Sequence, residues 1–116
     1  MTQYIQLDQK ENYSLLRFKD LKNIDANTAQ RVKAEVKGLL DEKTSNIIVD
    51  LSNIHFIDST GFGALISLLK TVKSRGGRLI LSSVSNEVQE LMDLMQLLNV
   101  FEIKKSVEDA EKSLKN

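Results

Sequence analysis

The sequence of 116 residues contains no cysteine and no proline, and its Lys+Arg and Asp+Glu counts are equal at 16. Without cysteine the chain has no disulfide, no thiolate metal ligand and no cysteine nucleophile. The charges balance and no basic run occurs, so nothing favours binding to nucleic acid or to an anionic membrane. With a single histidine and no carboxylates clustered at ligand spacing, we expect no metal site and no cofactor.

The chain also lacks long apolar runs and linker-like segments. Residues 1–8 have neither the basic start nor the apolar stretch of a signal peptide, and no run is long enough to span a bilayer. We therefore expect a cytoplasmic protein. The five glycines are scattered and 41% of the residues are hydrophobic, so residues 1–116 are expected to form one domain around one core.

What the chain contains is an alternation of strand and helix patterns. Apolar residues at every second position, or in short β-branched runs, predict strands at 4–7, 13–18, 47–51, 78–81 and 101–103. Apolar residues spaced three or four apart predict helices over 25–42, 62–72, 86–98 and 106–114. The first two strands form a hairpin in this interpretation. Strands that alternate with helices imply parallel strands joined by right-handed crossovers. The expected fold is α/β, with a four- to five-stranded mixed β-sheet packed against about four α-helices.

The predicted helices carry specific expectations about their ends and faces. Asp25 is a suitable N-cap for the first helix, which is expected to run to Glu42. Glycines at 76 and 77 are expected to end the second helix, because glycine adopts the left-handed cap conformation. The apolar residues of the first and third helices are expected to face the core: Ala29, Val32, Val36, Leu39, Leu40, Val88, Leu91, Met92, Met95 and Leu98.

The candidate functional segment is 52–63, between the strand at 47–51 and the second helix. In open α/β sheets, function lies beyond the carboxyl ends of the parallel strands. Asp58, Ser59 and Thr60 are residue types that cap helices, and Gly61 allows another backbone to come close. One interpretation is that Asp58 or Ser59 is simply the N-cap of the second helix. The other is that Ser59 presents an exposed hydroxyl that is meant to be modified. A phosphate there would face the positive end of the helix dipole and add about −1.5 to −2 charges beside Asp58.

The run IVDLSNIHFIDSTGFG at 48–63 closely resembles the signature of STAS domains of the anti-sigma factor antagonist type. That signature is an apolar strand ending in Asp-Leu-Ser, a short apolar loop, and Asp-Ser-Ser/Thr-Gly-apolar-Gly. Residues 24–29 resemble the family's entry into its first helix, and residues 76–79 its return to the sheet, so the resemblance covers essentially the whole chain. The sequence departs from the pattern at Lys22, where many members have glycine, and at Phe62, where Leu or Val is commoner. The first departure bears on the identity of the partner.

The resemblance implies a partner switch that regulates sigma-dependent transcription. The unmodified protein would bind an anti-sigma factor that is also a serine-protein kinase, and phosphorylation of Ser59 by that kinase would release it. A metal-dependent PP2C-type serine phosphatase would restore the binding form. The residues implied in partner binding are Asp58, Thr60, Gly61, Phe62 and Asp25. The balanced charge and the absence of a heptad seam favour a monomer when the protein is free.

Three alternatives remain beside this hypothesis. His55 and Ser59 could suggest an acyl-transfer pair, but the Gly-x-Ser-x-Gly elbow and a third orienting group are absent, so we do not expect an enzyme. Gly61-x-Gly63 opens a helix as in dinucleotide sites, but position 66 is isoleucine and Lys70 lies too far along for a phosphate-binding lysine. The third alternative is a constitutive STAS interaction module, an adaptor in a transport or signalling complex, without a phospho-switch.

Overall fold

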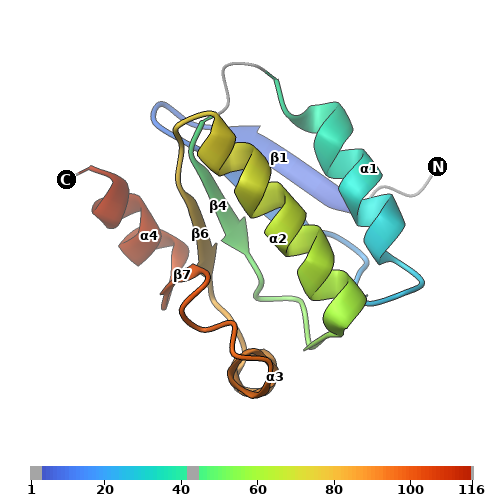
Figure 1. The fold of residues 1–116 in the computed structure, drawn as a ribbon. Helices are drawn as coiled ribbons and strands as arrows, with labels where there is room; N and C mark the ends of the chain where they lie inside the picture. The colour runs from blue at the N-terminus through green and yellow to red at the C-terminus, as the bar shows by residue number, and fades with distance from the viewer. Residues whose placement is uncertain (1–3, 42–44, 116) are drawn as a thin grey trace.

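The computed structural model describes residues 4–41 and 45–115, in which a five-stranded sheet is flanked by four α-helices (Figure 1). The strands lie in the order β1-β2-β4-β6-β7, with β1 antiparallel to β2 and the other neighbours parallel. Their bounds are Ile5–Gln9, Ser14–Phe18, Ile47–Asp50, Leu79–Ser82 and Glu102–Lys104. The expected hairpin and the expected mixed sheet with parallel crossovers are both confirmed.

The helices cover both faces of the sheet. Helices α1 (Ala29–Leu39) and α2 (Ser59–Ser74) lie next to each other over one face, and α4 (Val107–Leu114) lies on the opposite face (Figure 1). Helix α3 (Asn86–Leu94) sits at the edge where the parallel strands end (Figure 1). Within the residues described, no helix combines the length and apolar character needed to cross a membrane.

Strand β4 is apolar from Ile47 to Val49 because helices pack on both of its faces. Ile47 and Val49 point into the core beneath α1 and α2, whereas Ile48 joins a smaller cluster with Ala110 of α4. These three side chains of β4 have an exposed fraction of 0%. Burial of each such side chain stabilises the fold by about 1.5–3 kcal/mol. The continuous apolar run therefore marks the centre of the sheet, as the sequence predicts.

A second, two-stranded sheet was not anticipated from the sequence. Strand β3 (Asn23–Ile24) pairs in parallel with β5 (Phe56–Ile57), and the Ile24 and Ile57 side chains are both 0% exposed. This pairing joins the loop before α1 to the loop before α2. It therefore fixes the two candidate segments of the site against each other.

Helix α1 is shorter than the sequence suggests. The prediction of Asp25 as N-cap is wrong, because the helix begins at Ala29 after Thr28. The Asp25 carbonyl instead accepts from the amides of Thr28 and Ala29, at 3.1 and 2.8 Å, and closes a turn. The helix ends at Leu39, which is 43% exposed rather than facing the core. The expected end at Glu42 falls outside the described residues.

Helix α3 also ends earlier than predicted. Val88 and Met92 are buried as expected, but Met95 and Leu98 are 39% and 37% exposed, so their assignment to the core is wrong. The helix stops at Leu94, and Gln96 two residues later has a φ of 58°. A left-handed residue turns the chain away from the helical path, so that Leu97 packs against the core and Leu98 does not.

Helix α2 begins at Ser59, three residues before the predicted start, and three other predicted helix ends agree with the structure. Helix α2 ends at Ser74, and Gly76 has a φ of 75°, which is the left-handed conformation expected there. Ser85 and Ser106 cap α3 and α4, because their hydroxyls accept from the amides of Val88 and Asp109 at 3.1 Å in both cases. Capping signals that depend on local sequence alone are therefore read correctly at these positions.

Candidate functional site

Asp58 is the N-cap of α2 and a bridge between two loops. Its Oδ1 accepts a hydrogen bond of 2.9 Å from the amide of Gly61, and its Oδ2 accepts one of 3.2 Å from the amide of Ala26. The first bond satisfies an amide of the first helical turn, and the negative charge lies at the positive end of the helix dipole. The second bond ties the start of α2 to the loop before α1. Both carboxylate oxygens of Asp58 are thus held by backbone amides.

Ser59 is the first residue of α2 and is exposed. In the described part of the chain, neither its hydroxyl nor its amide has a hydrogen-bond partner. Asp58 performs the capping, so the Ser59 hydroxyl is not needed to start the helix. Of the two residues that could cap this helix, Asp58 is the one that does so. The Ser59 hydroxyl is left available to solvent. Thr60 follows at the next helical position and is exposed as well.

Gly61 and Phe62 lie inside the molecule. A Cβ on Gly61 would stand 2.0 Å from the Ile24 carbonyl oxygen, so the start of α2 packs directly on β3 with no room for a side chain. Phe62 is 1% exposed and belongs to the main core. Both residues were predicted to bind a partner, yet their burial leaves them no surface to offer. Their role in this structure is to fix the position of the helix start.

The loop from Asp20 to Thr28, which leads into α1, borders a shallow hollow. The hollow has a volume of about 700 Å³ and is lined almost entirely by polar residues, among them Asp25 and His55. Asp25 is half-buried, and its Oδ1 accepts from the Asn27 amide at 3.0 Å. Asp25 and Asp58 are both linked to the 25–27 turn, Asp25 through Asn27 and Asp58 through Ala26. The structure therefore brings these two predicted partner-binding residues to one edge of the sheet.

The departure from the family pattern at Lys22 has a small effect on the backbone. Lys22 is exposed, and its carbonyl accepts from the His55 amide at 2.7 Å. Among described residues other than glycine, only Asp20, Ser83 and Gln96 have a positive φ. Lys22 thus adopts a conformation open to any L-residue, so a glycine is not required there and the loop keeps its pairing with the segment before β5.

His55 does not form a catalytic pair with Ser59 in this arrangement. The imidazole is exposed, and no hydrogen bond joins it to Ser59 or to an orienting carboxylate in the region that the structure describes. A serine nucleophile requires a base in hydrogen-bond contact that is itself held in place. The site has the features of a surface turn and lacks those of an acyl-transfer centre.

Exposed apolar side chains at the same edge were missed by the sequence interpretation. Leu94, at the end of α3, is 81% exposed, and Phe56 on β5 is 42% exposed. Helix α3 packs on β5, and β5 ends one residue before Asp58. Large exposed apolar side chains that gather on one surface mark interaction sites. The signal was present in the sequence as leucine and methionine at 94–98, but periodicity assigned them to a longer helix.

Comparison with known proteins gives the chain its family. The family model described as the STAS domain matches residues 4–110. The chain is 30% identical over 81 residues to an anti-sigma-B factor antagonist of Listeria monocytogenes, which covers 70% of this chain and 71% of the relative. It is 27% identical over 99 residues to the anti-sigma-B factor antagonist of Bacillus subtilis, with 85% and 90% covered.

Solved structures share the fold. An anti-sigma factor antagonist from Mycobacterium paratuberculosis superposes with a TM-score of 0.82 at 16% identity, over 97% of this chain and 93% of that one. The phosphorylated form of the Bacillus cell fate determinant SpoIIAA gives a TM-score of 0.67 at 17% identity, over 94% and 98%. A sulfate transporter family protein from Wolinella succinogenes gives 0.72 at 20% identity, over 87% and 84%. The chain belongs to the STAS domain family and resembles, in sequence and in fold, the anti-sigma factor antagonists within it.

Proposed function

We propose that this protein is an anti-sigma factor antagonist that works as a partner switch. With Ser59 unmodified it binds an anti-sigma factor that is also a serine-protein kinase, and it releases that partner once Ser59 is phosphorylated. The observation that carries the proposal is that Ser59 is exposed and its hydroxyl has no hydrogen-bond partner among the described residues, while Asp58 caps the helix. The names of the relatives from Listeria and Bacillus support the same function.

A phosphate on Ser59 would change the surface far more than the fold. The Ser59 and Thr60 amides at the first turn of α2 are open to an anion, and the helix dipole favours negative charge there. The modified protein therefore keeps its stability. At the same time the phosphate adds about −1.5 to −2 charges next to the Asp58 carboxylate. An apolar or acidic partner surface that fits the unmodified turn is then repelled.

The proposed contact surface surrounds this turn. Asp25, Asp58 and Thr60 supply its polar part, since each is at least partly accessible at the edge of the sheet. Phe56 and Leu94 supply exposed apolar area beside it. An apolar centre with polar groups around it is the usual composition of a protein–protein interface. Gly61 and Phe62 contribute indirectly, because they set the position of the helix that carries Ser59.

The other components follow from this mechanism. The kinase supplies the phosphoryl group from ATP, so the antagonist itself needs no cofactor and performs no catalysis. A PP2C-type serine phosphatase returns Ser59 to the hydroxyl form, and the free protein is a cytoplasmic monomer. The downstream target would be a sigma factor released from the partner.

The test is a parallel capture experiment with Ser59→Ala and Ser59→Asp proteins as baits in lysate of the source organism. We expect a kinase-like protein on the alanine bait and its loss from the aspartate bait, with unfolding midpoints of the two baits close to each other. Recovery of the same proteins by both baits would contradict the switch. That outcome would favour a constitutive adaptor, a role in keeping with the similar fold of the Wolinella transporter-family protein.

A further inference from the structure

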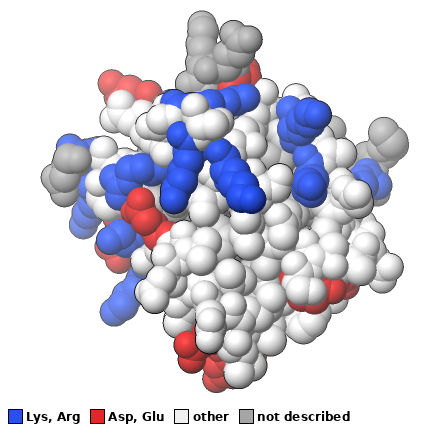
Figure 2. Space-filling model, viewed as in Figure 1, with Lys and Arg blue, Asp and Glu red and all other residues white. Residues whose placement is uncertain are grey.

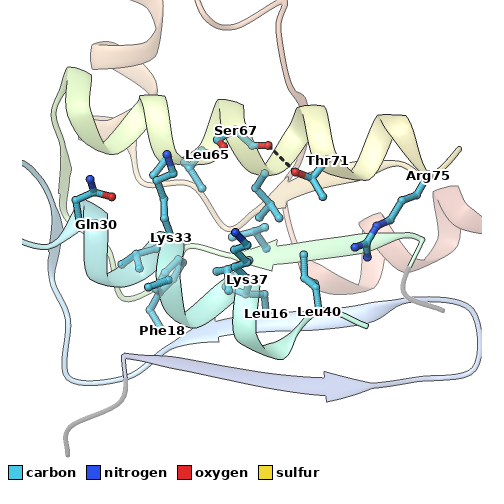
Figure 3. Close-up of a pocket in the computed structure, with 16 residues that line it drawn as sticks. Leu16, Phe18, Gln30, Lys33, Lys37, Leu40, Leu65, Ser67, Thr71 and Arg75 are labelled. Atoms are coloured by element: carbon cyan, nitrogen blue, oxygen red, sulfur yellow. Dashed lines mark hydrogen bonds between the residues drawn. The ribbon is translucent and has the colours of Figure 1, made fainter. Parts of the chain in front are cut away.

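A groove of about 540 Å³ runs between α1 and α2 on the face of the sheet that they cover (Figure 3). Small side chains, Ala34 on α1 and Ala64 and Ser67 on α2, form part of its walls. The larger apolar side chains of both helices, such as Val32 and Leu65, are buried in the main core. The space between the helices is therefore left open, and it lies in the volume range of ligand-binding clefts.

The floor of the groove is apolar. It is formed by Leu16, Phe18 and Val49 of the sheet together with Leu65 and Leu68 of α2, all of which are buried. Figure 3 shows the side chains of Lys33 and Lys37 rising from α1 at the mouth of the groove, with Lys33 reaching toward α2. A lysine covers apolar surface with its aliphatic stem while its ammonium group stays in water. The two lysines can thus swing aside without leaving a charge buried.

Lys33 and Lys37 bring positive charge to the mouth of the groove. Among the described residues, neither Lys33 nor Lys37 forms an ion pair. The neighbouring carboxylate on α1, Glu35, is occupied by the Tyr4 and Ile5 amides and by Arg31. In Figure 2, basic side chains gather over α1 and the far half of α2, whereas the lower part of this face is largely uncharged. An anionic group is therefore favoured at the mouth.

We propose that this groove binds a free medium-chain fatty acid. The aliphatic chain would lie between the helices along Ala34 and Ala64, and the carboxylate would be held between the ammonium groups of Lys33 and Lys37. Residues four apart on a helix are neighbours on its surface, which suits two-sided contact with one carboxylate.

The test is titration of the protein with octanoate, decanoate and dodecanoate below their micelle concentrations, followed by calorimetry and by NMR of the alanine methyl groups. We expect saturable binding of one molecule, with shifts at Ala34 and Ala64. Affinity should rise about two- to fourfold for each added methylene group. The double variant Lys33→Glu/Lys37→Glu should bind dodecanoate at least about tenfold more weakly, because two attractions become repulsions.

The matched control is Lys70→Glu/Lys73→Glu. It makes the same charge change on exposed lysines of α2 that do not line the groove, so dodecanoate affinity should stay within about twofold. Ala34→Leu, at an exposed helical position, fills the groove without removing charge and should also abolish binding. The proposal is overturned if dodecanoate gives no saturable shift, if the control weakens binding as much as the groove variant, or if dodecyl maltoside binds equally well. Shifts that map to Leu94 instead would also overturn it.

Discussion

The Oδ1 atom of Asp58 accepts a hydrogen bond of 2.9 Å from the amide of Gly61, across the first turn of the helix that begins with Ser59. The residue before the proposed phosphoacceptor is therefore also the residue that holds the acceptor's helix in place. Its second oxygen accepts from the Ala26 amide at 3.2 Å, which extends the same constraint to the loop before α1. The site is a rigid platform on which the Ser59 hydroxyl is left free.

Asp58→Ala should destabilise the protein by about 1–2 kcal/mol, because it removes a helix cap and a second hydrogen bond. Urea denaturation measures the change. Ser106→Ala is the matched control, since it removes the cap of α4 on the opposite face of the sheet, at a cost of about 1 kcal/mol. Only Asp58→Ala should also weaken partner binding. Equal loss of partner binding in both variants would mean that Asp58 acts only through stability.

Gly61→Ala should destabilise the protein by about 3 kcal/mol, because the new Cβ would lie 2.0 Å from the Ile24 carbonyl oxygen and 2.8 Å from Ile57 Cγ2. Gly63→Ala, two residues later in the same helix, meets no atom within 4 Å. That variant should be neutral or more stable by up to about 1 kcal/mol, because alanine is the better helix former. Thermal unfolding of the two proteins separates them. Similar melting temperatures would be inconsistent with the close packing of α2 on β3.

The Tyr13 phenol donates a hydrogen bond to Glu111 of α4, and we expect the free energy of unfolding to fall at alkaline pH as this phenol ionises. Burial, and then its hydrogen bond to Glu111, raises the pKa of Tyr13 from 10.0 to about 12. The folded-state pKa lies above the unfolded value, so this contribution to stability is complete below pH 10 and is lost as the pH rises toward 12. Tyr13→Phe should flatten the stability profile in that range. An unchanged profile in urea titrations at several pH values would argue against this contact.

Leu94→Ser should leave stability within about 0.5 kcal/mol of the parent, because the side chain is 81% exposed. If Leu94 contacts the partner, the same change should weaken binding about tenfold, as for an interface residue worth more than 1 kcal/mol. Leu39→Ser is the control, since Leu39 is 43% exposed and lies at the C-terminal end of α1, the end farther from the 25–27 turn. Calorimetric titration with the partner recovered on the Ser59→Ala bait measures both. Equal affinities for Leu94→Ser and the parent would exclude Leu94 from the interface.

Much of the fold can be predicted from this sequence because its signals are local or periodic. The apolar run at 47–49 marks a central strand, and serines 85 and 106 mark helix starts that the structure confirms. The start of α1 was misplaced because Asp25 and Thr28 are both capping residue types. The pairing of β3 with β5 places Asp25 in a turn and so leaves Thr28 as the residue before the helix. No local sequence pattern reveals this contact, because the two strands lie about thirty residues apart in the chain.

The candidate site was predicted in its sequence position but only partly in its geometry. The spacing of Asp58, Ser59 and Gly61 left open which residue caps the helix, and only the hydrogen bond from the Gly61 amide assigns the cap to Asp58. Phe62 was implied in partner binding by the family resemblance, but its position on α2 points it into the core. The exposed side chains after Leu94 were missed because the left-handed Gln96, which helps to end α3, carries no glycine signal.

The central claim is that Ser59 is the residue whose phosphorylation ends the partner complex. The most direct measurement is to mix the purified partner with the parent protein and ATP, follow the complex by sedimentation, and locate the phosphate by peptide mass spectrometry. We expect one phosphate on Ser59, none on Thr60, and loss of the complex as that phosphate appears, with the Ser59→Ala complex persisting. A phosphate on another residue, or a complex that survives complete phosphorylation of Ser59, would contradict it.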